Sequence, residues 1–215
     1  MRRPVLLVGT SALGRDVAEA VRASGREVLG CVADQTAAPS GGRPVRDGSV
    51  PLLGGLDAVL SHSEAGIVLC AEPGAVRARL HGRLAGMGVE DSRYAVVVHP
   101  SVYQPPSCVV GRGSVVLAGV VLATGVTIGE HVLCMASVTI SRDDVIGSYA
   151  TLCPGATLAA DVRIGEFAQV GTGAVVGQGV VVGDGAVLGV GAAVSHDVAA
   201  GRTVTGRSPA GGAGQ

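Results

Sequence analysis

The chain has 215 residues and a formal net charge of −1, with 47% hydrophobic residues but only 2% aromatic ones. This near-neutral charge, without a basic run, gives no electrostatic basis for binding nucleic acid or an anionic membrane. The high apolar content excludes a disordered chain, and no apolar run reaches transmembrane length. We expect a core of Val, Leu, Ile and Ala, which suits stacked, repetitive layers.

Residues 1–95 alternate between predicted strands and helices. The expected strands cover residues 4–9, 27–34, 66–70 and 94–98, the expected helices residues 14–25 and 74–88, and a loop residues 41–50. Apolar runs define the strands, and a glycine ends each helix. This alternation implies a parallel sheet with crossover helices, as in a Rossmann-like α/β domain.

The turn after the first predicted strand is GTSALG, from Gly9 to Gly14. It lies where a Rossmann-type unit binds phosphate at a helix N-terminus. Ser11 stands in place of the middle glycine of GxGxxG, where the backbone would approach a pyrophosphate. An ordinary strand–helix turn, with Ser11 as helix cap, is therefore equally compatible. Ser11 and Asp34, at the end of the second strand, are candidate substrate-binding residues.

From Val109 to Val204 the chain divides into sixteen uninterrupted hexads, beginning VVGRGS, VVLAGV and VLATGV. The second position is Val, Leu or Ile in all but two hexads, and glycine often fills the third. Inward aliphatic residues, glycines at turns and small residues at corners let short strands stack into coils. The period predicts a parallel β-helix over 109–206, after a linker at 96–108 and before a flexible tail at 207–215.

The five cysteines are scattered, odd in number and without a CxxC pair. Buried free thiols in a cytoplasmic protein are therefore favoured over disulfides or a metal site. Met1–Pro4 leads into an apolar stretch that is too short for a signal peptide. We expect a cytoplasmic protein without a membrane partner.

The hexads, in the form [LIV]-Gly-x-x-[small]-x, resemble those of the hexapeptide-repeat acyltransferases, whose β-helix is left-handed with three hexads per coil. The whole chain is similar to the branch that contains the sialic acid O-acetyltransferases and bacillosamine N-acetyltransferases, where a Rossmann-like domain precedes the helix. The matching segments are LLVGTSALGRDVAEAV, VHPSVYQPPSCVVGRGSVV, VIGSYATLCPGATLAADVRIGEFAQVGTGAVV and AAVSHDVAAGRTVTGRSPA.

This resemblance implies a homotrimer that binds acetyl-CoA or another acyl-CoA as co-substrate in the groove between neighbouring helices. It implies a small-molecule acceptor, of which a nucleotide-sugar is one kind. It assigns the approach of the pantetheine chain to Gly171, Gly173, Gly189 and Gly191. The same glycines are needed at turns whether or not CoA binds, so they are weak evidence alone.

The family uses a histidine as catalytic base, and alignment backward from VIG puts Arg142 at its position. Asp143 keeps the acidic residue that follows, and Asp144 replaces a cysteine. An asparagine of the family falls on Met135 and a second histidine on Thr151, which makes both positions candidates for substrate binding. The resemblance thus places a non-standard active site on the turn TISRDD.

Arginine cannot act as the base, since it stays charged where imidazole titrates. Arg142 is therefore either a surface residue paired with Asp143 or Asp144, or a clamp for a substrate carboxylate or phosphate. Asp143 and Asp144 are the candidate bases, because desolvation raises the pKa of a carboxylate. His131, at a turn, is expected to be solvated.

The sequence favours an acyl-CoA-dependent N- or O-acyltransferase with Arg142 in place of the usual histidine base. Two alternatives stay open. One is a non-catalytic trimeric homologue, and the other is a diverged enzyme with another group-transfer chemistry on the same scaffold.

Overall fold

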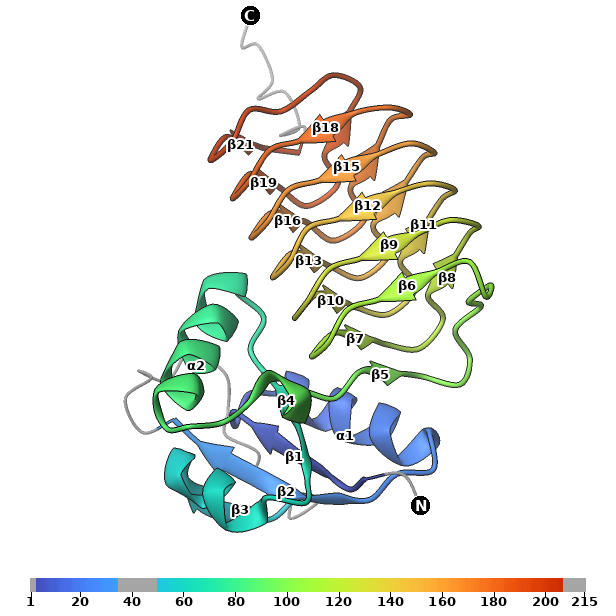
Figure 1. The fold of residues 1–215 in the computed structure, drawn as a ribbon. Coiled ribbons are helices and arrows are strands. Elements are labelled where there is room, and N and C mark those ends of the chain that lie inside the picture. The colour runs from blue at the N-terminus through green and yellow to red at the C-terminus, as the bar shows by residue number, and fades with distance from the viewer. Residues whose placement is uncertain (1–2, 35–49, 207–215) are drawn as a thin grey trace, which may run out of the picture.

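The structure is a computed structural model that describes residues 3–34 and 50–206. The expected tail at 207–215 and nearly all of the expected loop at 41–50 lie outside the described residues. Figure 1 shows an α/β domain at the base and a β-helix that rises above it. Both parts of the predicted fold, the Rossmann-like domain and the left-handed parallel β-helix, are confirmed.

The first domain is built on a four-stranded parallel sheet in the order β3-β2-β1-β4. Its elements are β1 (Val5–Val8), α1 (Leu13–Ala23), β2 (Val28–Ala33), β3 (Leu52–Gly55), the 3-10 helix η1 (Leu56–His62), β4 (Gly66–Leu69), α2 (Gly74–Gly86) and the 3-10 helix η2 (Asp91–Arg93). All side chains of β1 and β4 are buried, as expected for a sheet that is covered on both faces.

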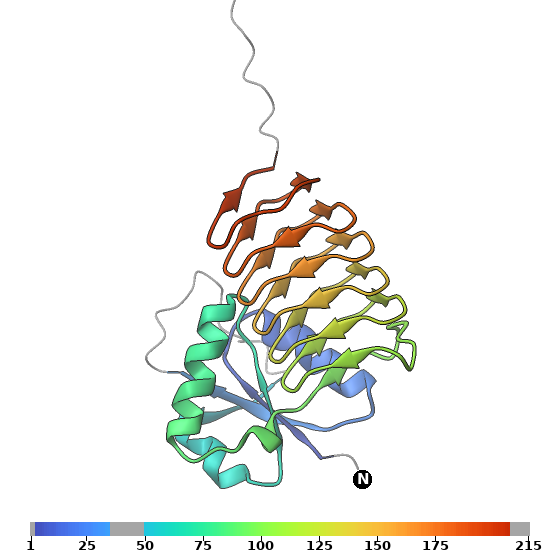
Figure 2. The same cartoon turned by 45° about the horizontal axis from the view of Figure 1, so that its top comes forward.

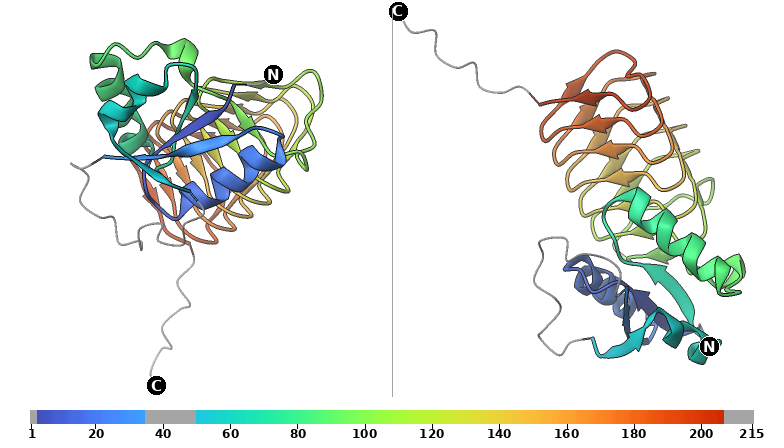
Figure 3. Two further views of the ribbon diagram at one scale, coloured as in Figure 1. Left: turned by 90° about the horizontal axis from the view of Figure 1, so that it is seen from below. Right: turned by 90° about the vertical axis from the view of Figure 1, so that its left-hand side faces the viewer.

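The two helices of this domain connect it to the β-helix in different ways. Helix α1 packs between the sheet and the lowest coils, with Val17 and Val21 in the same apolar cluster as Val115 and Leu133. Helix α2 runs alongside the lower coils, as the right-hand view of Figure 3 shows. Neither α1 nor α2 is both long and apolar enough to cross a bilayer, and no other helix in the described ranges is.

The β-helix consists of three parallel sheets whose strands are two residues long. The strands are β5 (Val97–Val98), β6 (Val109–Val110), β7 (Val115–Val116), β8 (Val121–Leu122), β9 (Thr127–Ile128), β10 (Leu133–Cys134), β11 (Thr139–Ile140), β12 (Val145–Ile146), β13 (Thr151–Leu152), β14 (Thr157–Leu158), β15 (Arg163–Ile164), β16 (Gln169–Val170), β17 (Val175–Val176), β18 (Val181–Val182), β19 (Val187–Leu188), β20 (Ala193–Val194) and β21 (Thr203–Val204).

Each coil contains three hexads, because each strand pairs with the strand 18 residues away. Leu133, for example, pairs with Val115 on one side and Thr151 on the other. Figure 2 shows the successive coils stacked along one axis. Strand β5, inside the expected linker, already pairs with β7, so the β-helix begins before the first hexad.

The hexad pattern explains the core of the β-helix. The second residue of each strand points inward, and Leu122, Ile140 and Leu158 are fully buried in one such column. The small or β-branched sixth residue fills the corner, as Val126 and Ala168 do. The coils therefore share one aliphatic core that runs the length of the helix.

A buried arginine on α2 fastens the first domain to the β-helix. Arg77 is 2% exposed. Its Nε donates to the carbonyl of His131 at 2.8 Å, and its Nη2 donates to the carbonyls of Tyr149 and Ala150 at 2.8 and 2.9 Å. Gly74, at the start of α2, packs against the Tyr149 carbonyl so closely that a Cβ would collide with it. These contacts set how the two domains are oriented.

An aromatic column follows the same edge of the β-helix. His131, Tyr149 and Phe167 occupy the fifth hexad position of successive coils, and adjacent rings stack with centroids 5.1 Å apart. His81 and Tyr94 of the first domain pack against His131 at 4.6 and 4.8 Å. The expectation that His131 is solvated is wrong, because the first domain covers it and leaves it 1% exposed.

Candidate active site

Arg142, Asp143 and Asp144 share the turn that connects β11 to β12. Arg142 and Asp143 are exposed, whereas Asp144 is fully buried. Among the described residues, the Arg142 side chain forms neither a hydrogen bond nor an ion pair, so the pairing with Asp143 or Asp144 is absent. The turn therefore presents a guanidinium that is available to an anion from solution.

The Asp143 carboxylate faces solvent beside this guanidinium. Asp143 adopts a left-handed backbone conformation (φ 60°), which Asp tolerates better than most residues. Its Oδ1 lies directly over Gly125, one coil away, where any side chain would collide with it. Asp161 has the same hexad position one coil further along, also with a positive φ.

Asp144 is held inside the β-helix by two backbone amides. Its Oδ2 accepts a hydrogen bond from the Ser141 amide at 2.9 Å, and its Oδ1 accepts one from the Val162 amide of the next coil at 2.8 Å. Burial raises the pKa of Asp144 to about 6, and these two hydrogen bonds partly oppose the shift.

Ser114 shows what a polar residue at the sixth position does. Its Oγ accepts from the Val132 amide, 18 residues on, at 2.9 Å. Asp144 makes the equivalent bond to Val162, so coil-to-coil bonding accounts for a polar group at this corner. Catalysis by Asp144 stays a prediction that this geometry does not require.

Met135 and Thr151 do not lie on the edge of the β-helix that carries Arg142. Thr151 is 3% exposed at the domain junction, where its Oγ1 donates to the Glu72 carbonyl at 2.7 Å and accepts from Arg77 Nη2 at 3.1 Å. Met135 is partly buried against the cluster that α1 shares with the lower coils. Within one chain, both residues serve the contact between domains, and their substrate-binding role stays a prediction.

The four glycines assigned to CoA lie on the turns after β16 and β19, on the same edge as Met135. A Cβ on Gly171 would come within 2.6 Å of the Gly189 backbone, so stacking of the coils requires glycine there. Gly173 and Gly191 have φ of 64° and 65° and open space around them. Turn geometry explains all four, and their contact with CoA stays a prediction.

Ser11 and Asp34 lie at the carboxyl ends of β1 and β2, the edge where parallel sheets bind ligands. Ser11 Oγ donates to the Cys70 carbonyl at 2.9 Å and makes no cap, since α1 has no side-chain hydrogen bond at its N-terminus. The Asp34 side chain is buried in an ion pair with Arg83 of α2. Both side chains thus fasten neighbouring elements, and ligand binding by either stays a prediction.

The cysteines offer no nucleophile for a covalent mechanism. All five are free, and only Cys153 is more than marginally exposed. Burial raises the pKa of both Cys70 and Cys134 to about 12, which keeps these thiols protonated at neutral pH. Carboxylate and guanidinium chemistry at Arg142 and Asp143 is what the described part of the site can supply.

No protein-family model matches the chain, and no curated protein matches it. Solved structures do. The acetyltransferase domain of PglB from Neisseria gonorrhoeae FA1090, in complex with acetyl coenzyme A, is 27% identical with a TM-score of 0.82, covering 96% of this chain and 97% of that one. PerB from Caulobacter crescentus, in complex with CoA and GDP-perosamine, is 25% identical with a TM-score of 0.83, covering 96% and 95%.

WeeI from Acinetobacter baumannii AYE is 25% identical with a TM-score of 0.78, covering 94% of this chain and 96% of that one. These similarities extend over both domains and leave almost no part of either chain unmatched. The resemblance to the hexapeptide-repeat acetyltransferases that act on sugars is thereby confirmed.

Proposed function

We propose that the protein is an acyl-CoA-dependent N-acyltransferase, with acetyl-CoA as the donor and an amino sugar linked to a nucleotide as the acceptor. The observation that carries this proposal is the nearly full-length similarity to two acetyltransferases solved with acetyl-CoA or CoA. PerB, a GDP-perosamine N-acetyltransferase, favours an amine over a hydroxyl as the attacking group.

The reaction needs little beyond correct positioning. The acceptor amine attacks the thioester carbonyl, the C–S bond breaks, and the CoA thiolate takes up a proton while the nitrogen loses one. We assign the acceptance of the amine proton to Asp143, an exposed carboxylate on the turn that aligns with the family's base. We assign to Arg142 an anionic group of a substrate, because its guanidinium has no partner among the described residues.

We further infer a homotrimer in which acyl-CoA binds between neighbouring β-helices. The outward residues of one sheet support this arrangement, since they form a row without any charge from β8 to β20: Val121, Thr139, Thr157, Val175 and Ala193. Val121 and Val175 are 42% and 48% exposed in the single chain. A neighbouring subunit would cover this apolar row.

The proposal is tested first by calorimetric titration with acetyl-CoA and then by release of free CoA with a panel of nucleotide-linked amino sugars. Asp143→Asn should lower kcat at least about 100-fold, since it removes the proton acceptor. Asp161→Asn is the matched control, with the same hexad position one coil away, and should stay within about twofold of the parent.

Three results would change the assignment. Absence of acetyl-CoA binding at millimolar concentration would favour the non-catalytic homologue. Binding without transfer to any amine would favour another group-transfer chemistry. Equal loss of kcat in Asp143→Asn and Asp161→Asn would remove Asp143 as the specific base.

A further inference from the structure

A pocket of about 460 Å³ opens at the edge of the first domain opposite to its ligand-binding edge. Arg3 precedes β1, Arg26 precedes β2 and Gly66 begins β4, so the pocket lies at the amino ends of these parallel strands. Ser11 and Asp34 are at their carboxyl ends. The pocket is therefore separate from both the expected nucleotide edge and the turn at Arg142.

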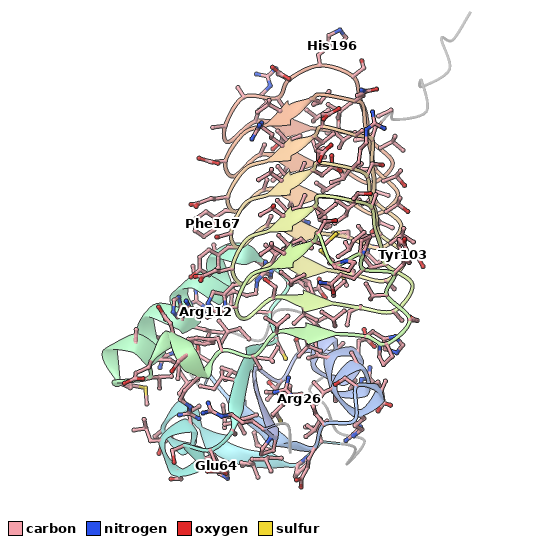
Figure 4. All side chains as sticks on the ribbon, turned by 45° about the vertical axis from the view of Figure 1, so that its right-hand side comes forward. Arg26, Glu64, Tyr103, Arg112, Phe167 and His196 are labelled. Carbon is pink, nitrogen blue, oxygen red and sulfur yellow. The ribbon has the colours of Figure 1, made fainter. Side chains whose placement is uncertain are left out.

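Three arginines and two serines line this pocket, and no acidic residue does. The chain as a whole has a formal net charge of −1, so this concentration of positive charge is local. Figure 4 shows Arg26 beside α1 and the strands of the first domain, whereas Arg112 lies beside α2. A concave wall with several guanidinium groups and no carboxylate attracts anions.

Two of the arginines are held in place by main-chain carbonyls. Arg93 donates from Nη1 to the Val59 carbonyl at 3.2 Å and from Nη2 to the His62 carbonyl at 2.6 Å. Arg26 donates from Nε to the Arg3 carbonyl at 3.1 Å. Carbonyl bonds fix a guanidinium without neutralising its charge, so the positive charge at the pocket is preorganised.

The third arginine is available to a ligand. The Arg3 side chain is exposed and has no hydrogen-bond or ion-pair partner in residues 3–34 and 50–206. It lies at the rim of a pocket whose charge is already fixed on the inside. Closure of Arg3 over an anion would complete a three-sided cationic site.

The pocket also contacts the segment between the two domains. Val96 and Val98 line it, Arg26 Nη1 donates to the Val96 carbonyl at 3.2 Å, and Val98 belongs to β5. The wall is thus apolar on one side and cationic on the other. The volume exceeds that of a bare phosphate and falls within the range for small-molecule sites.

We propose that this pocket binds the phosphate group of a small molecule, with Arg3, Arg26 and Arg93 as its cationic ligands and Val96 and Val98 against the rest of the ligand. A tetrahedral dianion offers enough oxygens for several guanidinium groups, which recognise phosphate in bidentate fashion. Bound there, it links α1, the sheet and the interdomain segment.

The test is calorimetric titration of the full-length protein, in a low-salt buffer without phosphate, with inorganic phosphate and with AMP. The parent should bind at least one of them below millimolar Kd. Arg3→Ala should weaken that binding about tenfold or more, because it removes a charge-assisted contact without removing a structural hydrogen bond. Arg79→Ala, which removes an exposed guanidinium from α2, should bind like the parent.

A rise in Tm with added ligand, present in the parent and reduced in Arg3→Ala, would confirm that the folded protein is the binding species. Tighter binding of AMP than of inorganic phosphate would assign the apolar wall to the body of the ligand, and equal binding would assign the site to phosphate alone. No heat with either probe, or equal affinity of Arg3→Ala and the parent, would overturn the proposal.

Discussion

Asp144 shows how one polar side chain is accommodated inside an aliphatic β-helix. Two backbone amides, of Ser141 and Val162, depend on its carboxylate for their hydrogen bonds. Asp144→Ala should therefore lower the free energy of unfolding by about 2 kcal/mol, since buried amides lose their acceptor. Urea denaturation at pH 7 measures this change.

Asp144→Ser is the informative companion, since Ser114 already shows that a serine Oγ accepts the amide 18 residues on. This variant should lie within about 1 kcal/mol of the parent. Full transferase activity in Asp144→Ser would leave Asp144 with a structural function only. Loss of activity in this stable variant would make it a base.

His131 predicts how acid affects the fold. Burial lowers the pKa of His131 to about 4 from its ordinary value of 6.5. Below pH 6.5 the unfolded chain binds a proton that the folded chain does not, so stability falls as the pH drops toward 4. The full difference corresponds to about 3 kcal/mol.

His131→Phe should remove this part of the pH dependence. The Nδ1 of His131 is buried without a hydrogen-bond partner, so an apolar ring in its place should not reduce stability at pH 7. Denaturation of both proteins at pH 7, 5.5 and 4.5 tests this. Parallel curves for the two would show that His131 is protonated without cost in the fold.

At the scale of elements, α2 depends on a single side chain for its position. Replacing Arg77 by Met should cost about 3–5 kcal/mol, because buried carbonyls of the β-helix lose their donor. Hydrogen exchange should show lost protection in Gly74–Gly86 and unchanged protection in the upper coils. Arg79→Met, at an exposed position of the same helix, is the control. Equal exchange in both variants would contradict the role of Arg77.

The sequence predicted elements well where a pattern repeats or an apolar run is continuous. The hexads fixed the three-strand coils because every coil repeats the same spacing. Strand β3 and the 3-10 helix η1 were missed, because LLGG alternates exposed and half-buried residues at a sheet edge. The spacing of His131, Tyr149 and Phe167 by 18 residues was a signal for the aromatic column that could have been used.

At the scale of the whole molecule, the predicted trimer has a direct consequence for the apolar row on β8 to β20. Val175→Arg should convert a species of about three times 21.1 kDa into a monomer, as measured by light scattering. Val181→Arg is the matched control, since Val181 is 41% exposed on the neighbouring sheet. Dissociation by Val181→Arg alone would place the interface on that neighbouring sheet.

The candidate site was harder to predict than the fold, since its assembly depends on contacts with no local signal. Arg77 reaches carbonyls 54 to 73 positions away in the sequence. Those contacts, and not any motif, enclose Thr151 and His131 beneath the first domain. The motif reading gave the turn at Arg142 but could not show that Asp144 turns inward while Asp143 faces solvent.

The pairing of strands 18 residues apart has a consequence for how this chain can change in length. Loss of one hexad would keep every aliphatic residue facing inward, yet it would rotate all later residues by one side of the triangle. Tyr149 and the residues around it would leave the first domain, and the edge that carries Arg142 would change places with another. Only whole coils can be gained or lost without this rotation, so the face on which a residue lies is set by counting hexads in threes.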